Sequence, residues 1–426
     1  MANKWVNVAV VGTGRIYQDA HRHGYASRYS TNNVVVGLCD LDEKRGKEEL
    51  KWLKKEYERR LKKAEKKEPE DAERIKFGLQ YLDFYTDYDK MLDKLEGTLE
   101  FVDNCTEGRG HVPLAVKAME HGYHAMSEKP PALNWWDAKR LVEAEKKTGK
   151  FFALAENVCY ERSSLKAREV VTGGKIGTIE EIALQFGHGG PYVPYVLGPT
   201  GLPHFIDPIM SGGGTLQDLA PHGISRALWP LGPNVRVVAC ETRKVERRKN
   251  PREMSGKKFT SPVDDWVEAK LEMHDPRTNS NFFMDVTTSW CGGFSFPFTI
   301  TTDKGDFTIA KNPKGKTYDP VLYPEDGEPT FFPVDDDPWE PHESHIREIQ
   351  MFCDNILKNQ PAITPATYAL HLQEVLSIQY LSKLKKKRVT LEEMEQFGQE
   401  IAKNYSDYQQ QVNNISLELI KSVDLL

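Results

Sequence analysis

The chain has 426 residues, which exceeds a typical single domain and predicts two. Hydrophobic residues make up 39% of it and charged residues 28%, and no apolar run approaches the roughly 20 residues of a membrane-spanning helix, so we expect a globular protein with no membrane partner. The net charge of −6 gives no electrostatic reason to expect nucleic acid as a partner.

The N-terminal residues lead directly into a strand without the charged and apolar regions of a signal peptide, so we expect a cytoplasmic protein. The six cysteines show no CxxC or CxxH spacing, which favours small core residues over a disulfide framework or a zinc site. His342 and His345 have no evident third ligand, and we therefore assign no metal.

A β-rich run at residues 6–11 ends in a Gly-Thr-Gly turn, after which residues 15–28 can form a helix. In this context the backbone can approach a dinucleotide pyrophosphate at the helix N-terminus. Tyr17 occupies the place of the third glycine of the fingerprint, so we expect relaxed packing or a displaced helix there. The candidate cofactor-binding residues of this turn are Gly12, Gly14, Arg15 and Ile16.

Asp40 follows the second strand, at residues 34–39. A carboxylate at that strand end can accept both ribose hydroxyls of NAD and would repel the 2′-phosphate of NADP. Lys44 and Arg45 leave some room for NADP, and Asp40 could instead merely cap the following helix. We favour NAD as the cofactor over NADP.

Residues 42–67 have apolar residues at spacings of three and four, which predicts a long helix; a shorter one follows from Pro69 to residue 79. With this insertion, at about residues 44–79, the alternating strands and helices predict a doubly wound parallel sheet, a Rossmann domain, over residues 1–155. Longer, mostly antiparallel strands predict an α+β domain with a large open sheet over residues 156–426. An exposed sheet face is a common subunit contact, so we expect a homo-oligomer, a dimer or a tetramer.

The run 123–131 begins as a buried strand and ends in Glu128, Lys129 and two prolines. Because proline cannot continue the ladder, Lys129 is predicted to point out of the sheet edge at which open α/β sheets bind ligands. Glu128 and Lys129 then share an edge with Gly12 and Asp40. The alternative is an ordinary strand end with a surface ion pair.

Two segments of the second domain carry candidate chemistry. After three glycines, Asp218 and His222 are four apart, which places them on one helical face, where the carboxylate would orient the imidazole as a proton acceptor. A structural histidine is the alternative. The glycine-rich loop from His188 to Tyr192, with His204 and Asp207 after it, could line a sugar pocket, although a flexible loop explains it almost as well.

Taken in order, these motifs resemble the glucose-fructose oxidoreductase/inositol dehydrogenase/MocA family from residue 6 to about residue 391. The matching residues are Gly12-Thr13-Gly14, Thr106, His111, Glu128-Lys129-Pro130, Gly212-Gly213-Gly214 and Asp218 with His222. The resemblance implies a Rossmann domain, a C-terminal α/β sheet domain, a nicotinamide cofactor and oxidation of a pyranoside or polyol at a secondary hydroxyl. It implies that Lys129 contacts substrate and nicotinamide, and that Asp218 and His222 lie at the reacting hydroxyl. Further candidates are Thr106, His111 and Glu128 for the cofactor, and Tyr160, His188 and Tyr192 for the substrate.

The chain departs from this family at Tyr17 and at Glu107, which stands where proline is usual. Residues 156–160 look like a motif of NAD-dependent α-N-acetylgalactosaminidases, which oxidise a sugar transiently to eliminate its substituent but typically lack the lysine. We therefore expect an NAD-dependent sugar or polyol dehydrogenase first, a redox-assisted glycosidase second and a non-catalytic NAD-binding sensor third. His222 would take the hydroxyl proton while Lys129 hydrogen-bonds the alkoxide, although spacing alone leaves open which of the two takes the proton.

Overall fold

The computed structural model describes residues 4–27, 29–190, 203–247, 252–254, 257–259, 261–292, 298–335 and 342–425. The chain folds into two compact units, each made from separate stretches. The first consists of Met1–Pro131, Lys139–Tyr160 and Trp339–Thr367; the second consists of Ala132–Ala138, Glu161–Pro338 and Tyr368–Leu426. Within the described residues, no helix combines the length and the apolar content needed to span a bilayer.

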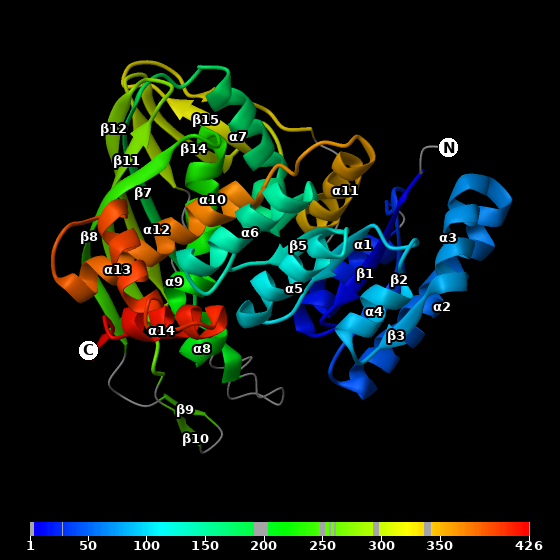
Figure 1. The fold of residues 1–426 in the computed structure, drawn as a ribbon. Coiled ribbons are helices and arrows are strands. Elements are labelled where there is room, and N and C mark those ends of the chain that lie inside the picture. Colours follow the sequence, from blue (N-terminus) through cyan, green and yellow to red (C-terminus); the bar gives the residue numbers. More distant parts are fainter. Residues whose placement is uncertain are drawn as a thin grey trace. The chain divides into compact units, whose positions relative to one another are not determined.

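The first unit contains a sheet of six strands that pair in parallel in the order β3-β2-β1-β4-β5-β6 (Figure 1). Its strands are β1 (Val6–Val11), β2 (Asn33–Cys39), β3 (Asp83–Tyr85), β4 (Phe101–Asn104), β5 (His124–Glu128) and β6 (Phe152–Ala155). Every residue of β1, β2 and β4 is buried. Because successive side chains point to opposite faces, both faces must be covered by helices. The predicted doubly wound sheet is thereby confirmed.

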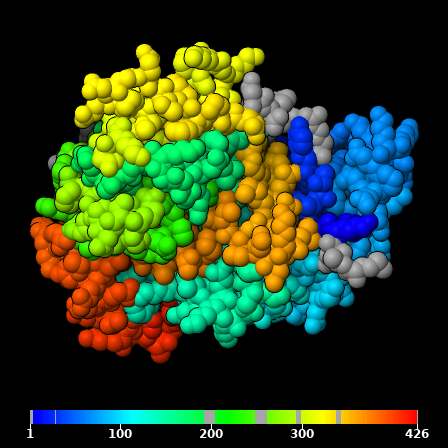
Figure 2. Space-filling model, turned by 90° about the horizontal axis from the view of Figure 1, so that it is seen from above, coloured from blue at the N-terminus to red at the C-terminus, as the bar shows by residue number. Residues whose placement is uncertain are grey.

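The insertion forms two helices, α2 (Glu43–Lys67) and α3 (Pro69–Tyr81), as the apolar spacing predicts. Asp42 caps α2, and Pro69 begins α3, where its missing N–H costs nothing. Figure 2 shows both helices, in light blue, on the surface of this unit. The other helices of the unit are α1 (Arg22–Ala26), α4 (Tyr88–Lys94), α5 (Gly108–Glu120), most of α6 (Trp135–Thr148), the 3-10 turn η2 (Asn157–Tyr160) and α11 (Glu343–Leu357).

The helix after the glycine turn is not a regular α-helix. Between residue 15 and α1 it widens into a π-helical turn, η1 (Tyr17–His21), and Tyr17 is fully buried. A π turn holds an additional residue, so the chain accommodates a bulky side chain where the fingerprint has glycine. The turn also brings His21 into the buried interior of the unit.

The second unit contains a ten-stranded, mostly antiparallel sheet, as predicted; among its described strands, the pairs β7–β12 and β8–β18 are parallel and the others are antiparallel. Burial alternates along β11, so one sheet face lies against the core while the other is largely open. The strands are β7 (Ile179–Gly187), β8 (Arg236–Arg247), β11 (Trp266–Asp275), β12 (Ser280–Ser289), β13 (Thr299–Thr302), β14 (Gly305–Lys311), β15 (Tyr318–Tyr323), β16 (Thr330–Phe331), β17 (Val389–Thr390) and β18 (Asp424–Leu425). A separate hairpin is formed by β9 (Arg252–Met254) and β10 (Lys257–Phe259).

One helix predicted for this unit differs from the structure. The single helix expected to carry Asp218 and His222 is interrupted at Leu219, because Pro221 has no N–H to donate to the carbonyl of Gln217. The remaining helices include the long α12, which the sequence analysis did not identify, and α13 and α14, which lie side by side (Figure 1). Their bounds are α7 (Arg162–Thr172), η4 (Pro203–Ile206), α8 (Pro208–Ser211), α9 (Thr215–Asp218), α10 (Ala220–Leu228), η5 (Trp229–Leu231), α12 (Ala366–Lys385), α13 (Leu391–Ala402) and α14 (Tyr408–Ile420).

Candidate active site

The glycine turn after β1 is built for close backbone approach. Gly12 has φ +86°, and a Cβ there would lie 2.8 Å from the carbonyl carbon of Cys105, so the position requires glycine. A Cβ on Gly14 would meet no described atom within 4 Å, which leaves the backbone open on that side. Arg15 is exposed and pairs with Asp19, and Ile16 is half-buried. A tight turn with an open second glycine before a helix fits the pyrophosphate of a dinucleotide.

Asp40 lies directly after β2 and closes the same turn. Its carboxylate accepts hydrogen bonds from Thr13 N at 2.7 Å, Thr13 Oγ1 at 2.8 Å and Asp42 N at 2.8 Å. Arg45 adds two more, from Nη2 at 2.6 Å and Nε at 3.1 Å. Burial raises the pKa of Asp40, but the Arg45 hydrogen bond and the others outweigh it and hold the pKa below its ordinary value. Asp40 therefore presents a charged, nearly saturated carboxylate, and its predicted contact with a cofactor ribose remains a prediction.

The loops after β4 and β5 are tied together by His111. Its Nδ1 lies 2.7 Å from the carbonyl oxygen of Pro130, and its Nε2 lies 3.0 Å from that of Thr106. Thr106 in turn donates from Oγ1 to Asn104 Oδ1 at 2.7 Å. His111 is 1% exposed, so this structure assigns it a bridging position, and its predicted contact with the cofactor remains a prediction.

Glu128 and Lys129 leave the sheet at the carboxyl end of β5, as predicted. Lys129 is half-buried, and its backbone N–H donates to Glu128 Oε2 at 3.0 Å. The other oxygen of Glu128 lies 2.8 Å from His21 Nε2, and His21 Nδ1 lies 2.8 Å from Asp103 Oδ2. Neither His21 nor Asp103 was predicted as a site residue, although an aspartate inside a buried strand was a signal for a partner nearby.

Tyr160, predicted to bind substrate, is buried in the first unit at the end of η2. Its hydroxyl lies 2.8 Å from Thr364 Oγ1, and its carbonyl accepts a hydrogen bond from Arg347 at 2.6 Å. Burial raises the pKa of Tyr160 well above its ordinary value, so the hydroxyl stays protonated. These contacts hold the end of η2 against the stretch 339–367.

In the second unit, the glycines before α9 allow close approaches, of Asp264 to Gly214 and of Tyr380 to Gly213. A Cβ on Gly214 would lie 2.0 Å from the Asp264 carbonyl oxygen, and one on Gly213 would lie 2.1 Å from the Tyr380 hydroxyl. The Asp264 carboxylate accepts from Gly214 N and Leu216 N, both at 2.9 Å, and from the Tyr380 hydroxyl at 2.6 Å. Burial raises its pKa. This buried carboxylate therefore fixes the start of α9.

Asp218 ends α9 and His222 lies in α10, on either side of the break at Leu219, and both side chains are half-buried. Asp218 Oδ2 accepts a hydrogen bond from the buried Trp290 Nε1 at 3.1 Å. The His222 ring lies 6.3 Å from the ring of Phe186. The predicted hydrogen bond between Asp218 and His222 remains a prediction.

The glycine-rich loop is described only in part, and Tyr192 lies outside the described residues. His188 follows β7; its backbone N–H donates to the Ser289 carbonyl at 3.0 Å, and its Nδ1 accepts from Gly190 N at 2.8 Å. Asp207 caps α8 by accepting from Ile209 N at 2.9 Å, which gives this carboxylate a local structural role.

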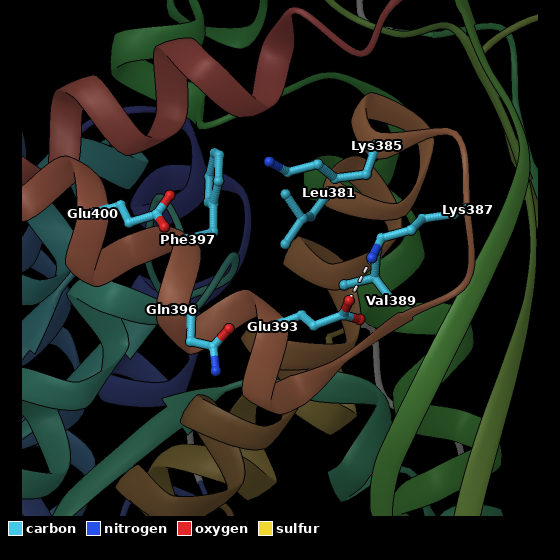
Figure 3. A pocket seen from close by; sticks show the side chains of 8 residues that line it. All are labelled: Leu381, Lys385, Lys387, Val389, Glu393, Gln396, Phe397 and Glu400. Atoms are coloured by element: carbon cyan, nitrogen blue, oxygen red, sulfur yellow. Dashed lines mark hydrogen bonds and ion pairs between the residues drawn. The ribbon is translucent and has the colours of Figure 1, made fainter.

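A surface groove of about 160 Å³ lies between α12, β17 and α13 (Figure 3). Two of its charged side chains, Lys387 and Glu393, pair with each other across it. Its lining contains none of the predicted site residues: it consists of Leu381, Lys385, Lys387, Val389, Glu393, Gln396, Phe397 and Glu400.

The parallel sheet in the order 3-2-1-4-5-6 and its open glycine turn define a dinucleotide-binding fold. The chain belongs to the Gfo/Idh/MocA family of oxidoreductases: the family's NAD-binding Rossmann fold matches residues 6–156, and its C-terminal domain matches residues 164–308. Family membership makes it an NAD-binding oxidoreductase and confirms the family and cofactor predicted from the sequence.

Individual proteins support this assignment. D-glucoside 3-dehydrogenase from Escherichia coli is 25% identical over 324 residues, 71% of this chain and 80% of that protein. An α-N-acetylgalactosaminidase from Bacteroides fragilis is 32% identical, but over only 84 residues, 20% of each chain. The fold matches that of levoglucosan dehydrogenase in complex with NADH and L-sorbose, with a TM-score of 0.70 at 17% identity, covering 91% of this chain and 99% of that one.

Proposed function

We propose that this oxidoreductase oxidises a secondary hydroxyl of a sugar, glycoside or polyol, or reduces the corresponding keto-sugar. The observation that carries the proposal is the position of Lys129 directly after β5, in the same parallel sheet in which Gly12 follows β1 and Asp40 follows β2. The similarity to a glucoside dehydrogenase over 71% of the chain supports the substrate class. When bound, NAD supplies the acceptor for the hydride.

Lys129 is proposed to donate a hydrogen bond to the reacting hydroxyl oxygen as negative charge develops on it. An ammonium group held in place before the reaction stabilises that charge without reorganising during the reaction. His222 is proposed to take the hydroxyl proton, and Asp218 to orient its ring. The Trp290 bond to Asp218 and the Asp264 bonds to the start of α9 would keep this carboxylate in place.

The experiment is a panel of free sugars, polyols and aryl glycosides incubated with NAD. NADH that accumulates with a free sugar, glycoside or polyol supports the dehydrogenase. Release of the aglycone with no net change in NADH would instead support the transient-oxidation glycosidase, which the short match to an α-N-acetylgalactosaminidase keeps as the second candidate. If neither NADH nor aglycone forms with any member of the panel, both candidate functions are contradicted.

We also propose a reducing compartment, the cytoplasm, for this protein. None of the six cysteines forms a disulfide, and five of them are buried. Small buried thiols without disulfides are typical of proteins that stay in a reducing environment. Expression with a fluorescent tag, followed by microscopy or fractionation, tests this.

A homo-oligomer, as a dimer or tetramer, is proposed through the open face of the ten-stranded sheet. Phe283 on this face is 47% exposed, and the Lys270 ammonium lies 4.7 Å from its ring centre. Lys270 also lies 3.4 Å from both Glu181 and Asp285, so the face combines an apolar ring with paired charges. Light scattering after gel filtration gives the subunit number, and Phe283→Glu should lower it.

A further inference from the structure

His21 is a fully buried histidine whose two ring nitrogens each face a carboxylate. Nδ1 lies 2.8 Å from Asp103 Oδ2 and Nε2 lies 2.8 Å from Glu128 Oε1. The three side chains are between 0% and 7% exposed. A neutral imidazole has one N–H and one lone pair, so it could donate to only one of these carboxylates. If both carboxyl groups are ionised, the contacts require the doubly protonated imidazolium, which donates to both.

The electrostatics agree with this charge state. Burial alone would lower the pKa of His21, but the Asp103 carboxylate raises it well above its ordinary value. Burial would likewise raise the pKa of Glu128, yet the His21 hydrogen bond and charge lower it from 4.5 to about 2. The His21 ring and the Glu128 carboxylate are thus charged at neutral pH, and each stabilises the other in this buried site.

The remaining groups around the ring are compatible with its positive charge. The Tyr25 hydroxyl donates to Asp103 Oδ2 at 2.7 Å, and burial keeps the pKa of Tyr25 well above its ordinary value. Glu348 on α11 lies 3.9 Å from His21 Nε2, and burial raises its pKa well above its ordinary value, which favours its neutral form. The other titratable groups near this cluster are Cys105, Lys129, Glu156 and His345.

The partners of the His21 ring lie on two neighbouring strands, and one of them connects the ring to Lys129. Asp103 lies near the end of β4 and Glu128 is the last residue of β5, and these strands are neighbours. One oxygen of Glu128 is held by His21, and the other accepts the backbone N–H of Lys129. The ring on η1 therefore determines where Glu128 can lie, and Glu128 determines where the backbone of Lys129 leaves the sheet.

We propose that His21 is a positioning residue for Lys129, acting through its bridge between Asp103 and Glu128. This inference rests on the proposed function in one respect only, the assignment of Lys129 to the reaction. His21 itself is too deeply buried to touch substrate. Two groups of potential metal ligands occur among the described residues, and both include His21: one adds Asp103 and Cys105, the other Glu128 and Glu348. The hydrogen bonds of His21 already occupy both of its ring nitrogens.

The test compares His21→Gln with Tyr25→Phe. Glutamine is neutral and has donors on one side only, so it cannot bridge two carboxylates, whereas phenylalanine removes a buried hydrogen bond to the same Asp103 oxygen without touching Glu128. We expect kcat of His21→Gln to fall by on the order of 100-fold through misplacement of Lys129, with little change in the Kd for NADH. Tyr25→Phe should keep kcat near the wild-type value.

Hydrogen exchange gives a readout that needs no substrate. The peptide covering residues 124–133 should exchange faster in His21→Gln than in wild type or in Tyr25→Phe, because the Lys129 N–H loses its fixed acceptor. Glu128→Gln is the second variant, should His21→Gln not fold, and it should reproduce the loss of kcat. The double variant with His21→Gln and Glu128→Gln should then have a kcat little lower than that of Glu128→Gln alone.

Three outcomes would overturn the proposal: wild-type kcat and exchange in His21→Gln, equal losses in His21→Gln and Tyr25→Phe, or a stoichiometric metal ion in the purified protein. If no sugar or polyol supports NAD reduction by the wild-type protein, the proposed function is contradicted. In that case the exchange comparison still decides whether His21 holds the Glu128-Lys129 backbone.

Discussion

The roles of the two glycines in the turn after β1 can be distinguished by replacing each with alanine, which adds a single methyl group. At Gly12 an alanine Cβ would lie 2.8 Å from the carbonyl carbon and oxygen of Cys105 and 2.9 Å from Thr106 N, all of them backbone atoms that cannot move aside cheaply. Its φ of +86° adds a left-handed conformation, which costs an L-residue about 1–2 kcal/mol. At Gly14 the same methyl group would contact no described atom within 4 Å.

The magnitudes follow from these contacts. Overpacking costs about 1–3 kcal/mol, so together with the strained φ Gly12→Ala should lose about 2–5 kcal/mol of unfolding free energy. Gly14→Ala should leave that free energy unchanged or raise it by up to about 1 kcal/mol, since alanine restricts the unfolded chain. Its methyl group instead fills the space through which the pyrophosphate approaches, and about 1–3 kcal/mol of overpacking there corresponds to a Kd for NADH about 5- to 150-fold higher.

Thermal unfolding and fluorescence titration with NADH, carried out on both variants and on wild type, make the comparison. Gly12→Ala should have a Tm lower by several degrees, whereas Gly14→Ala should melt like wild type and bind NADH weakly. Wild-type NADH affinity in Gly14→Ala would refute the placement of the pyrophosphate over this turn. A wild-type Tm in Gly12→Ala would refute the tight contact with the end of β4.

Three further predictions concern single side chains. Wild-type protein should bind NADH more tightly than NADPH, and Asp40→Ala should narrow the difference because it removes the carboxylate that repels a 2′-phosphate; wild-type preference for NADPH would contradict this. Lys129→Ala and His222→Ala should each lose roughly 100- to 10,000-fold in kcat while keeping NADH affinity, and a folded variant with near wild-type turnover would make that residue structural. The pKa of Glu128 is lowered from 4.5 to about 2, so between these pH values the carboxyl group is protonated in the unfolded state and ionised in the folded state. The stability that ionised Glu128 contributes is therefore present above pH 4.5 and lost toward pH 2. Chemical unfolding across this range should therefore show the stability advantage of wild type over Glu128→Gln shrinking as the pH falls, and a constant difference would contradict the charge assigned to Glu128.

Local patterns in the sequence determined much of the fold. Apolar residues at spacings of three and four, with Asp42 before them and Pro69 after them, were enough to place α2 and the start of α3. The alternation of strands and helices predicted the parallel sheet, and the glycine turn and the end of β5 predicted which residues reach its carboxyl edge. These features depend on neighbours a few residues apart, which the sequence displays directly.

The break between α9 and α10 was also readable, because Pro221 alone removes the N–H that a continuous helix from residue 215 needs. The prediction was wrong there because it gave the helical spacing of Asp218 and His222 more weight than the proline between them. The π turn at Tyr17 was anticipated only as a displacement, since a sequence shows that a side chain is too large but not how the backbone yields.

The tertiary structure alone decided what surrounds His21. Its partners Asp103, Glu128 and Glu348 are 82, 107 and 327 residues away in sequence, and only the pairing of β4 with β5 and the packing of α11 bring them together. Whether a buried histidine is charged depends on the sum of desolvation and the fields of such distant neighbours. The sequence of the helix that carries His21 does not show these contributions. The charge of His21 and its hydrogen bond to Glu128 are therefore apparent only in the folded chain.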